Sequence, residues 1–130
     1  MSDQIKHECG IAMVRLLKPL EFYREKYGTS FYGLNKMYLL MEKQHNRGKD
    51  GAGLANIKFD VPPGARYISR HRSNSNKPIQ EIFDHVHGRF SDLTKGDQEL
   101  LSDPQWLKEH TPFSGELFLG HLRYGTYGGN

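Results

Sequence analysis

The residue best suited to nucleophilic chemistry is Cys9, the single cysteine of the chain, which follows the polar segment 1–8. A thiol reacts as its thiolate, and a free cysteine loses its proton only near a pKa of ~8.5. If residues 1–8 were removed, the α-amine of Cys9, with a pKa of about 7.7–8.0, would serve as the base. We therefore interpret Cys9 as a candidate catalytic nucleophile. A buried structural thiol is the alternative.

A second candidate segment reads His-Asn-Arg-Gly-Lys-Asp-Gly-Ala-Gly over residues 45–53. Its glycines, with Asn and Asp between them, indicate tight turns, and its spacing does not match that of a phosphate-binding P-loop. The functional interpretation is that Arg47 and Gly48 support the nucleophile. Gly10 would let the backbone approach a substrate closely. The alternative is a surface loop between a helix and a strand.

A third candidate is Arg123, which follows the mostly apolar run 117–122. A guanidinium at the end of a strand can hold a carboxylate through two parallel hydrogen bonds. A salt bridge at the edge of the sheet would explain the same residue. The segment that follows is rich in glycine and hydroxyl groups, and its candidate pocket residues are Tyr124, Thr126 and Gly128.

Two strands are expected to position these candidates, one over 9–17 and an interior one over 117–122. A short helical segment over 20–26 and a longer helix, capped by Thr29 or Ser30 and ending near residue 45, lie between Cys9 and the glycine-rich segment. The longer helix has an apolar stripe with spacings of three and four residues, which predicts a core-facing side: Phe31, Leu34, Met37, Tyr38 and Met41.

The middle of the chain predicts an antiparallel strand pair over 54–59 and 65–70, followed by a polar, basic loop over 71–77. A helix is expected to begin at Pro78 and to bury Ile79, Ile82, Phe83 and Val86. His85 and His87 lie two residues apart and would face different sides of that helix, which argues against metal binding by this pair. A polar helical stretch over 97–110, interrupted at Pro104, is expected to dock through Trp106 and Leu107.

Composition is that of one modest globular domain: the chain has 130 residues, of which 36% are hydrophobic and 25% charged. The formal net charge of +3 permits an anionic partner but does not require nucleic acid. No apolar run approaches the ~18 residues of a membrane-spanning helix, and residues 1–8 lack the apolar centre of a secretory signal. A single cysteine suits a reducing compartment. These features predict a cytoplasmic protein without membrane or nucleic-acid partners.

Taken together and in this order, segments 9–11, 45–53 and 120–128 resemble the class II glutamine amidotransferases, whose glutaminase domains have an N-terminal nucleophile. That family has an N-terminal Cys-Gly-Ile, a His-Arg-Gly-X-Asp-X-Ala-Gly loop, and a Gly-His-X-Arg-Tyr/Trp-X-Thr-X-Gly strand and loop. The tyrosine that follows the motif's arginine, Tyr124, resembles the amidophosphoribosyltransferase branch of the family. The branch that makes glucosamine phosphate usually has tryptophan at that position. Glu8 is similar to the acidic end of the short propeptide that some amidophosphoribosyltransferases carry.

The resemblance implies an α+β fold, the layered αββα sandwich of the Ntn-hydrolase type, of which this chain would be the N-terminal portion. Residues 1–8 would be a leader or propeptide, and 9–130 the first part of a truncated glutaminase domain. Cys9 would attack the side-chain amide of glutamine, Arg123 would bind its α-carboxylate, and the other residues would shape or support the site: Tyr124, Thr126 and Gly128 in the pocket, and Gly10, Arg47 and Gly48 beside the nucleophile.

The resemblance further implies that ammonia passes to a phosphoribosyltransferase domain beyond this chain, where it would displace pyrophosphate from phosphoribosyl pyrophosphate in purine biosynthesis. Any Mg²⁺ would belong to that absent domain, and no cofactor is expected within 1–130. The full-length enzyme would form a homo-oligomer. Two alternatives are a glutaminase that serves another acceptor and a non-catalytic regulatory module on the same scaffold.

Two features depart from the family pattern. Asn46 is an extra residue between the histidine and the Arg-Gly of the second motif, and Lys49 replaces the more common glutamine. In the family, the oxyanion-hole Asn-Gly and the aspartate that binds the glutamine amino group lie further along than residue 130. Loss of one oxyanion donor costs ~2.7–4 kcal/mol in other hydrolases. We therefore expect little or no glutaminase activity from residues 1–130 alone.

Overall fold

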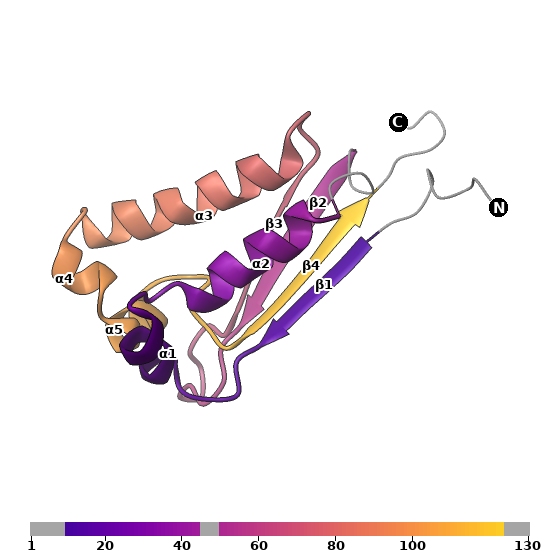
Figure 1. Ribbon diagram of the computed structural model, residues 1–130. Helices are drawn as coiled ribbons and strands as arrows, with labels where there is room; N and C mark the ends of the chain where they lie inside the picture. Colours follow the sequence, from indigo (N-terminus) through magenta and orange to yellow (C-terminus); the bar gives the residue numbers. More distant parts are fainter. Residues whose placement is uncertain (1–9, 45–49, 124–130) are drawn as a thin grey trace.

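The computed structural model describes residues 10–44 and 50–123, which form one antiparallel sheet with helices packed on one face (Figure 1). The strand order across the sheet is β1-β4-β2-β3, and each neighbouring pair is antiparallel. The strands are β1 (Gly10–Arg15), β2 (Gly51–Ile57), β3 (Ile68–Ser73) and β4 (Leu117–Arg123). The helices are α1 (Leu20–Tyr27), α2 (Tyr32–Glu42), α3 (Pro78–Thr94), α4 (Gln98–Leu101) and α5 (Pro104–His110).

The helical layer covers one face of the sheet: α2 packs on β1 and β4, and α3 packs on β2 and β3. Side chains alternate in exposure along β4, since Phe118 and Leu122 are buried while Leu119 is 38% exposed. The same alternation leaves Ile11 and Met13 of β1 exposed by 79% and 61%. Because successive side chains of a strand point to opposite faces, these residues mark a second face that no described helix covers.

The α2 stripe was predicted correctly: Leu34, Met37 and Met41 are buried, and Phe31 and Tyr38 pack against the core. Its approach to the sheet depends on Gly120 of β4. A Cβ at that position would lie 2.8 Å from Met37 Cε and 2.9 Å from Met41 Sδ. The glycine therefore makes room for both methionines, and a methionine side chain adapts well to such a gap.

Two predicted boundaries of α2 were wrong. Neither Thr29 nor Ser30 caps the helix, because the residue before its first turn is Phe31. Thr29 Oγ1 instead accepts a hydrogen bond from Phe31 N at 3.0 Å, which stabilises the turn that leads into the helix. The helix ends at Glu42 rather than near residue 45.

The boundaries of β2 and β3 also differ from the prediction. β2 begins at Gly51, so part of the glycine-rich segment is strand rather than loop. β3 extends to Ser73, so His71, Arg72 and Ser73 are not in a loop. Glycine usually marks a turn, but Gly53 lies opposite His121 of the central strand, and a Cβ there would collide with His121 Nε2. The large neighbour explains why glycine occupies a strand position.

The predictions for the helices after β3 were correct. Pro78 occupies the first turn of α3, where its missing N–H costs nothing, and Ile79, Ile82, Phe83 and Val86 are buried. Pro104 starts α5, and the Asp103 side chain accepts a hydrogen bond from Trp106 N at 3.1 Å. Leu107 is buried and Trp106 packs against the core, as expected.

The α+β fold class is thus observed, with one sheet in the part of the chain that the structure describes. The two-sheet αββα sandwich remains a prediction. None of the described helices combines the length and the apolar character that crossing a membrane requires.

Candidate functional site at one end of the sheet

The strand register brings three predicted segments to the same end of the sheet. Gly10, the residue after Cys9, pairs with Leu122, the residue before Arg123. On the other side of β4, Gly51 pairs with Arg123. Asp50 N, from the glycine-rich segment, donates a hydrogen bond to Arg123 O at 3.1 Å. Residues 10, 51 and 123 are therefore neighbours, although they are far apart in sequence.

Arg123 is exposed at this end of the sheet. It continues the alternation of β4, in which Leu119 and His121 are exposed on the face that no described helix covers. Among residues 10–44 and 50–123, no carboxylate lies within ion-pair distance of its guanidinium. The predicted alternative, a salt bridge at the sheet edge, therefore has no partner in that part of the chain. Arg123 also belongs to a central strand and not to an edge strand.

A groove of about 830 Å³ runs along this end and contains several basic side chains. Arg123 and His121 enter it from β4, and Arg70 and Arg72 enter it from β3. His121 lies over Gly53 of β2 and occupies the space that a side chain at position 53 would fill. The groove thus brings together several planar guanidinium groups, which suit the binding of a carboxylate. Asp50 also lines it and supplies an acidic group.

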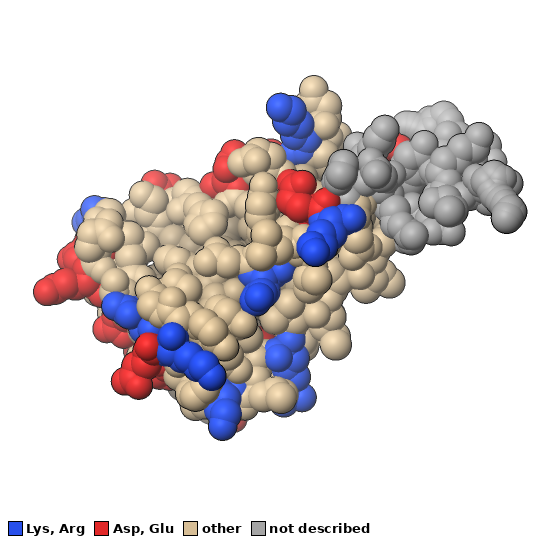
Figure 2. Space-filling model, in the orientation of Figure 1, with Lys and Arg blue, Asp and Glu red and all other residues tan. Residues whose placement is uncertain are grey.

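Figure 2 shows acidic and basic side chains interspersed on the surface seen in that view.

Four basic residues that line this groove were missed as site candidates: Arg70, His71, Arg72 and His121. Arg70 and Arg72 are two residues apart, which places them on one face of a strand, but the boundary of β3 was predicted too early for this to be used. His121 was part of a quoted motif. Its contact with Gly53 depends on the pairing of β2 with β4, which the sequence does not reveal.

Gly10 is the only proposed supporting residue that the structure describes. The space that its side chain would fill is on the helical face, where the Gln44 amide lies. Gln44 Nε2 also donates a hydrogen bond to Ile11 O at 3.3 Å. The other predicted site residues lie outside the described residues: Cys9, Arg47, Gly48, Tyr124, Thr126 and Gly128.

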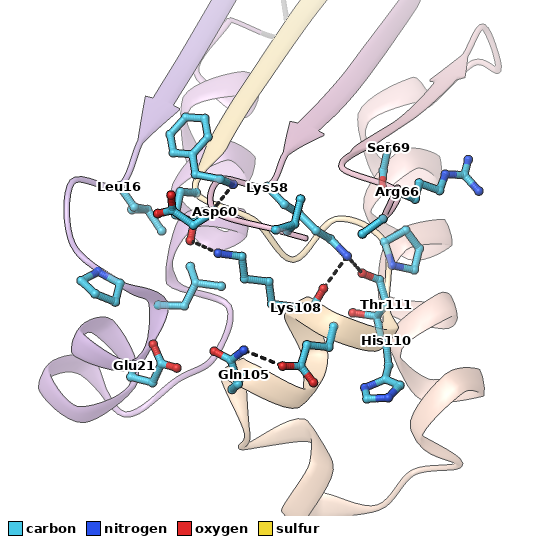
Figure 3. A pocket seen from close by; sticks show the side chains of 18 of the residues that line it. Leu16, Glu21, Lys58, Asp60, Arg66, Ser69, Gln105, Lys108, His110 and Thr111 are labelled. Carbon is cyan, nitrogen blue, oxygen red and sulfur yellow. Dashed lines mark hydrogen bonds and ion pairs between the residues drawn. The ribbon is translucent and has the colours of Figure 1, made fainter. Parts of the chain in front are cut away.

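A second cavity, of about 810 Å³, lies at the opposite end of the sheet, between the strand ends and helices α1 and α5 (Figure 3). Lys58 Nζ donates hydrogen bonds of 2.6 Å to the carbonyl oxygens of Lys108 and Thr111. Burial lowers the pKa of Lys58, and the nearby charges of Lys108 and Arg66 lower it further. Glu116 pairs with Lys108 at 2.7 Å and accepts a hydrogen bond from Phe59 N at 2.9 Å. These groups are paired with one another, so we interpret this cavity as structural.

Replacing Lys58 with methionine is expected to lower the free energy of unfolding by about 2 kcal/mol, because two carbonyl oxygens lose a charged donor. Lys36→Met is the matched control, since Lys36 is exposed on α2 and its ammonium lies over the Tyr32 ring. Urea unfolding monitored by circular dichroism measures both changes. An equal decrease in the free energy of unfolding in the two variants would show that the Lys58 hydrogen bonds do not stabilise the fold.

Comparison of the chain with family models, with curated proteins and with solved structures found no match.

Proposed function

We propose that this end of the sheet binds glutamine and that Cys9 hydrolyses its side-chain amide. The observation that carries the proposal is the register of β1, β4 and β2, which makes Gly10, Gly51 and Arg123 neighbours. Segments from all three quoted motifs are thereby joined at one site. The exposed Arg123 guanidinium provides a two-point contact for the α-carboxylate of the amino acid.

The reaction has two steps. The Cys9 thiolate, formed when the α-amine takes its proton, attacks the amide carbon of glutamine and gives a tetrahedral intermediate. The C–N bond then breaks, the amine returns the proton to the leaving nitrogen, and ammonia departs from a γ-glutamyl thioester. Water attacks that thioester, the C–S bond breaks, and glutamate is released with the thiol restored.

The open face of the sheet supports the αββα architecture that goes with this function. Ile11, Met13 and Leu119 are apolar and exposed on the side opposite the helices. A layer of strands on this face would bury them and give two stacked sheets with helices outside. In this arrangement Arg123 and His121 would lie beside the inter-sheet layer.

For the fate of the ammonia, we propose transfer to phosphoribosyl pyrophosphate by an amidophosphoribosyltransferase. Tyr124 in the third motif and Glu8 before the cysteine support this acceptor, through the resemblance described above. A different acceptor would leave the glutaminase chemistry unchanged, so the two parts of the proposal are tested separately.

The test is mass spectrometry of the intact active protein, before and after treatment with an electrophilic glutamine analogue. We expect an amino terminus at Cys9 and one covalent adduct on the peptide that begins with Cys9. An active enzyme that keeps residues 1–8 would contradict the role of the α-amine. Adduct formation elsewhere, or none, would contradict the glutaminase itself and favour a non-catalytic module. Dependence of product formation on phosphoribosyl pyrophosphate tests the acceptor.

Replacing Arg123 with lysine is expected to lower kcat/KM for glutamine roughly tenfold or more. Lysine keeps the charge but loses the second parallel hydrogen bond, which is worth about 1.5 kcal/mol to a charged partner. Arg15→Lys is the matched control, because Arg15 is exposed at the other end of the sheet. Steady-state kinetics in the intact protein measure the change. An unchanged kcat/KM in Arg123→Lys would remove this residue from the site.

A further inference from the structure

A second group of potential ligands lies on the helical side of β3. His71 comes from the strand, while Glu81 and His85 come from α3. Glu81 and His85 are four residues apart, so they lie on one face of the helix. One ligand atom from each of the three residues lies within 4.8 Å of the other two. This juxtaposition depends on the packing of α3 against β3. It includes His85 but not His87, so it differs from the pair considered from the sequence.

The contacts within this cluster already approach those of a metal site. His71 Nε2 lies 3.4 Å from Glu81 Oε1 and 3.5 Å from Glu81 Oε2. Two ligands at ~2.0–2.1 Å from a tetrahedral Zn²⁺ are separated by about 3.4 Å. The spacing of this pair therefore needs no change in the backbone.

His85 requires a change of side-chain torsion. The His71 and His85 rings are stacked, with centroids 3.8 Å apart and planes 4° apart. A metal ion lies in the plane of each imidazole that binds it. Two stacked, parallel rings have no point common to both planes, so at least one ring must rotate before both can bind the same ion. Rotation about χ2 of histidine is broad and inexpensive. Both rings are partly accessible, since His71 is half-buried and His85 is exposed.

The ligand set determines the class of ion. Two neutral imidazoles and one carboxylate suit Zn²⁺ and neighbouring divalent transition ions, and they do not suit Mg²⁺ or Ca²⁺, which prefer oxygen ligands. The Glu81 carboxylate supplies one negative charge, which favours a bound cation. Arg89, on the same helix as His85, supplies a positive charge that acts against it. We propose that His71, Glu81 and His85 bind one Zn²⁺ ion, with water completing the shell, and that the ion links β3 to α3.

The experiment is isothermal titration calorimetry of Zn²⁺ into the purified, tag-free, metal-stripped protein, paired with thermal unfolding. We expect one equivalent bound and a rise in Tm that EDTA reverses, because an ion that binds only the folded chain stabilises it. Glu81→Gln, His71→Asn and His85→Asn should each weaken Zn²⁺ binding by more than about tenfold, since even the loss of a supporting residue has an effect of that size.

His87→Asn is the matched control, because His87 is an exposed histidine on the same helix outside the cluster. It should bind Zn²⁺ as the unsubstituted protein does. Circular dichroism of each variant without metal separates loss of a ligand from loss of fold. The proposal is overturned if the unsubstituted protein binds no Zn²⁺, or if folded ligand variants keep full affinity. It is also overturned if Cys9→Ser removes the bound ion, which would place the ion at the thiol. The outcomes for the His71, Glu81 and His85 variants do not bear on glutamine hydrolysis.

Discussion

Replacing Cys9 with alanine in the intact protein is expected to lower kcat for glutamine hydrolysis by at least about 10⁴-fold. Removal of the nucleophile from subtilisin, a covalent hydrolase, reduces kcat by about 10⁶-fold, and the remaining activity comes from binding and from the oxyanion hole. Cys9 is the single thiol of residues 1–130, so no other thiol of this segment can replace it. The measurement is release of glutamate and ammonia from glutamine under saturating conditions.

The same variant separates catalysis from binding. Glutamine should still bind to Cys9→Ala with an affinity near that of the unsubstituted protein, because Arg123 and the groove remain. Synthesis driven by free ammonia should also persist, since it bypasses the thiol. Loss of both glutamine-driven and ammonia-driven synthesis would point to a structural cysteine, which was the alternative at the outset.

Replacing Gly115 with alanine is expected to lower the free energy of unfolding by about 3 kcal/mol, from overpacking and the loss of a buried hydrogen bond. Gly115 lies just before β4, and a Cβ there would lie 2.6 Å from Ile57 O and 2.8 Å from Lys58 Cα. Both are backbone atoms at the end of β2 and just after it, so no side-chain rotation relieves the contact. The Gly115 carbonyl also accepts a hydrogen bond of 3.1 Å from Asn56 Nδ2.

Gly88→Ala is the control for Gly115→Ala. Gly88 lies inside α3, and a Cβ there meets no atom within 4 Å. Alanine in a helix interior is favoured over glycine by roughly 0.5–1 kcal/mol, so this variant should be more stable. Urea unfolding measures both changes. If Gly115→Ala proves as stable as the unsubstituted protein, the inference that the backbone at 115 packs too closely on the end of β2 to admit a Cβ is wrong.

Local patterns predicted most of the secondary structure. The apolar stripe of α2 and the proline at the start of α3 each reflect a rule that acts within a few residues. The mostly apolar run 117–122 likewise predicted an interior strand, which is observed as β4 between β1 and β2. Such features need no knowledge of distant partners, which is why they were predicted correctly. The errors in the strands occurred at Gly51, Gly53 and residues 71–73, where pairing with another strand overrides local preference.

The amino-acid sequence by itself determined the candidate chemistry: one thiol near the amino terminus, one arginine at the end of an apolar strand, and a glycine-rich segment between them. Only the tertiary structure decided that Gly10 and Gly51 lie on either side of the end of β4 that carries Arg123, and that His71 stacks on His85. Hydrogen-bonded register between strands and packing of a helix on a sheet join residues that are far apart along the chain. Those contacts depend on the whole set of side chains at once, and no local pattern encodes them.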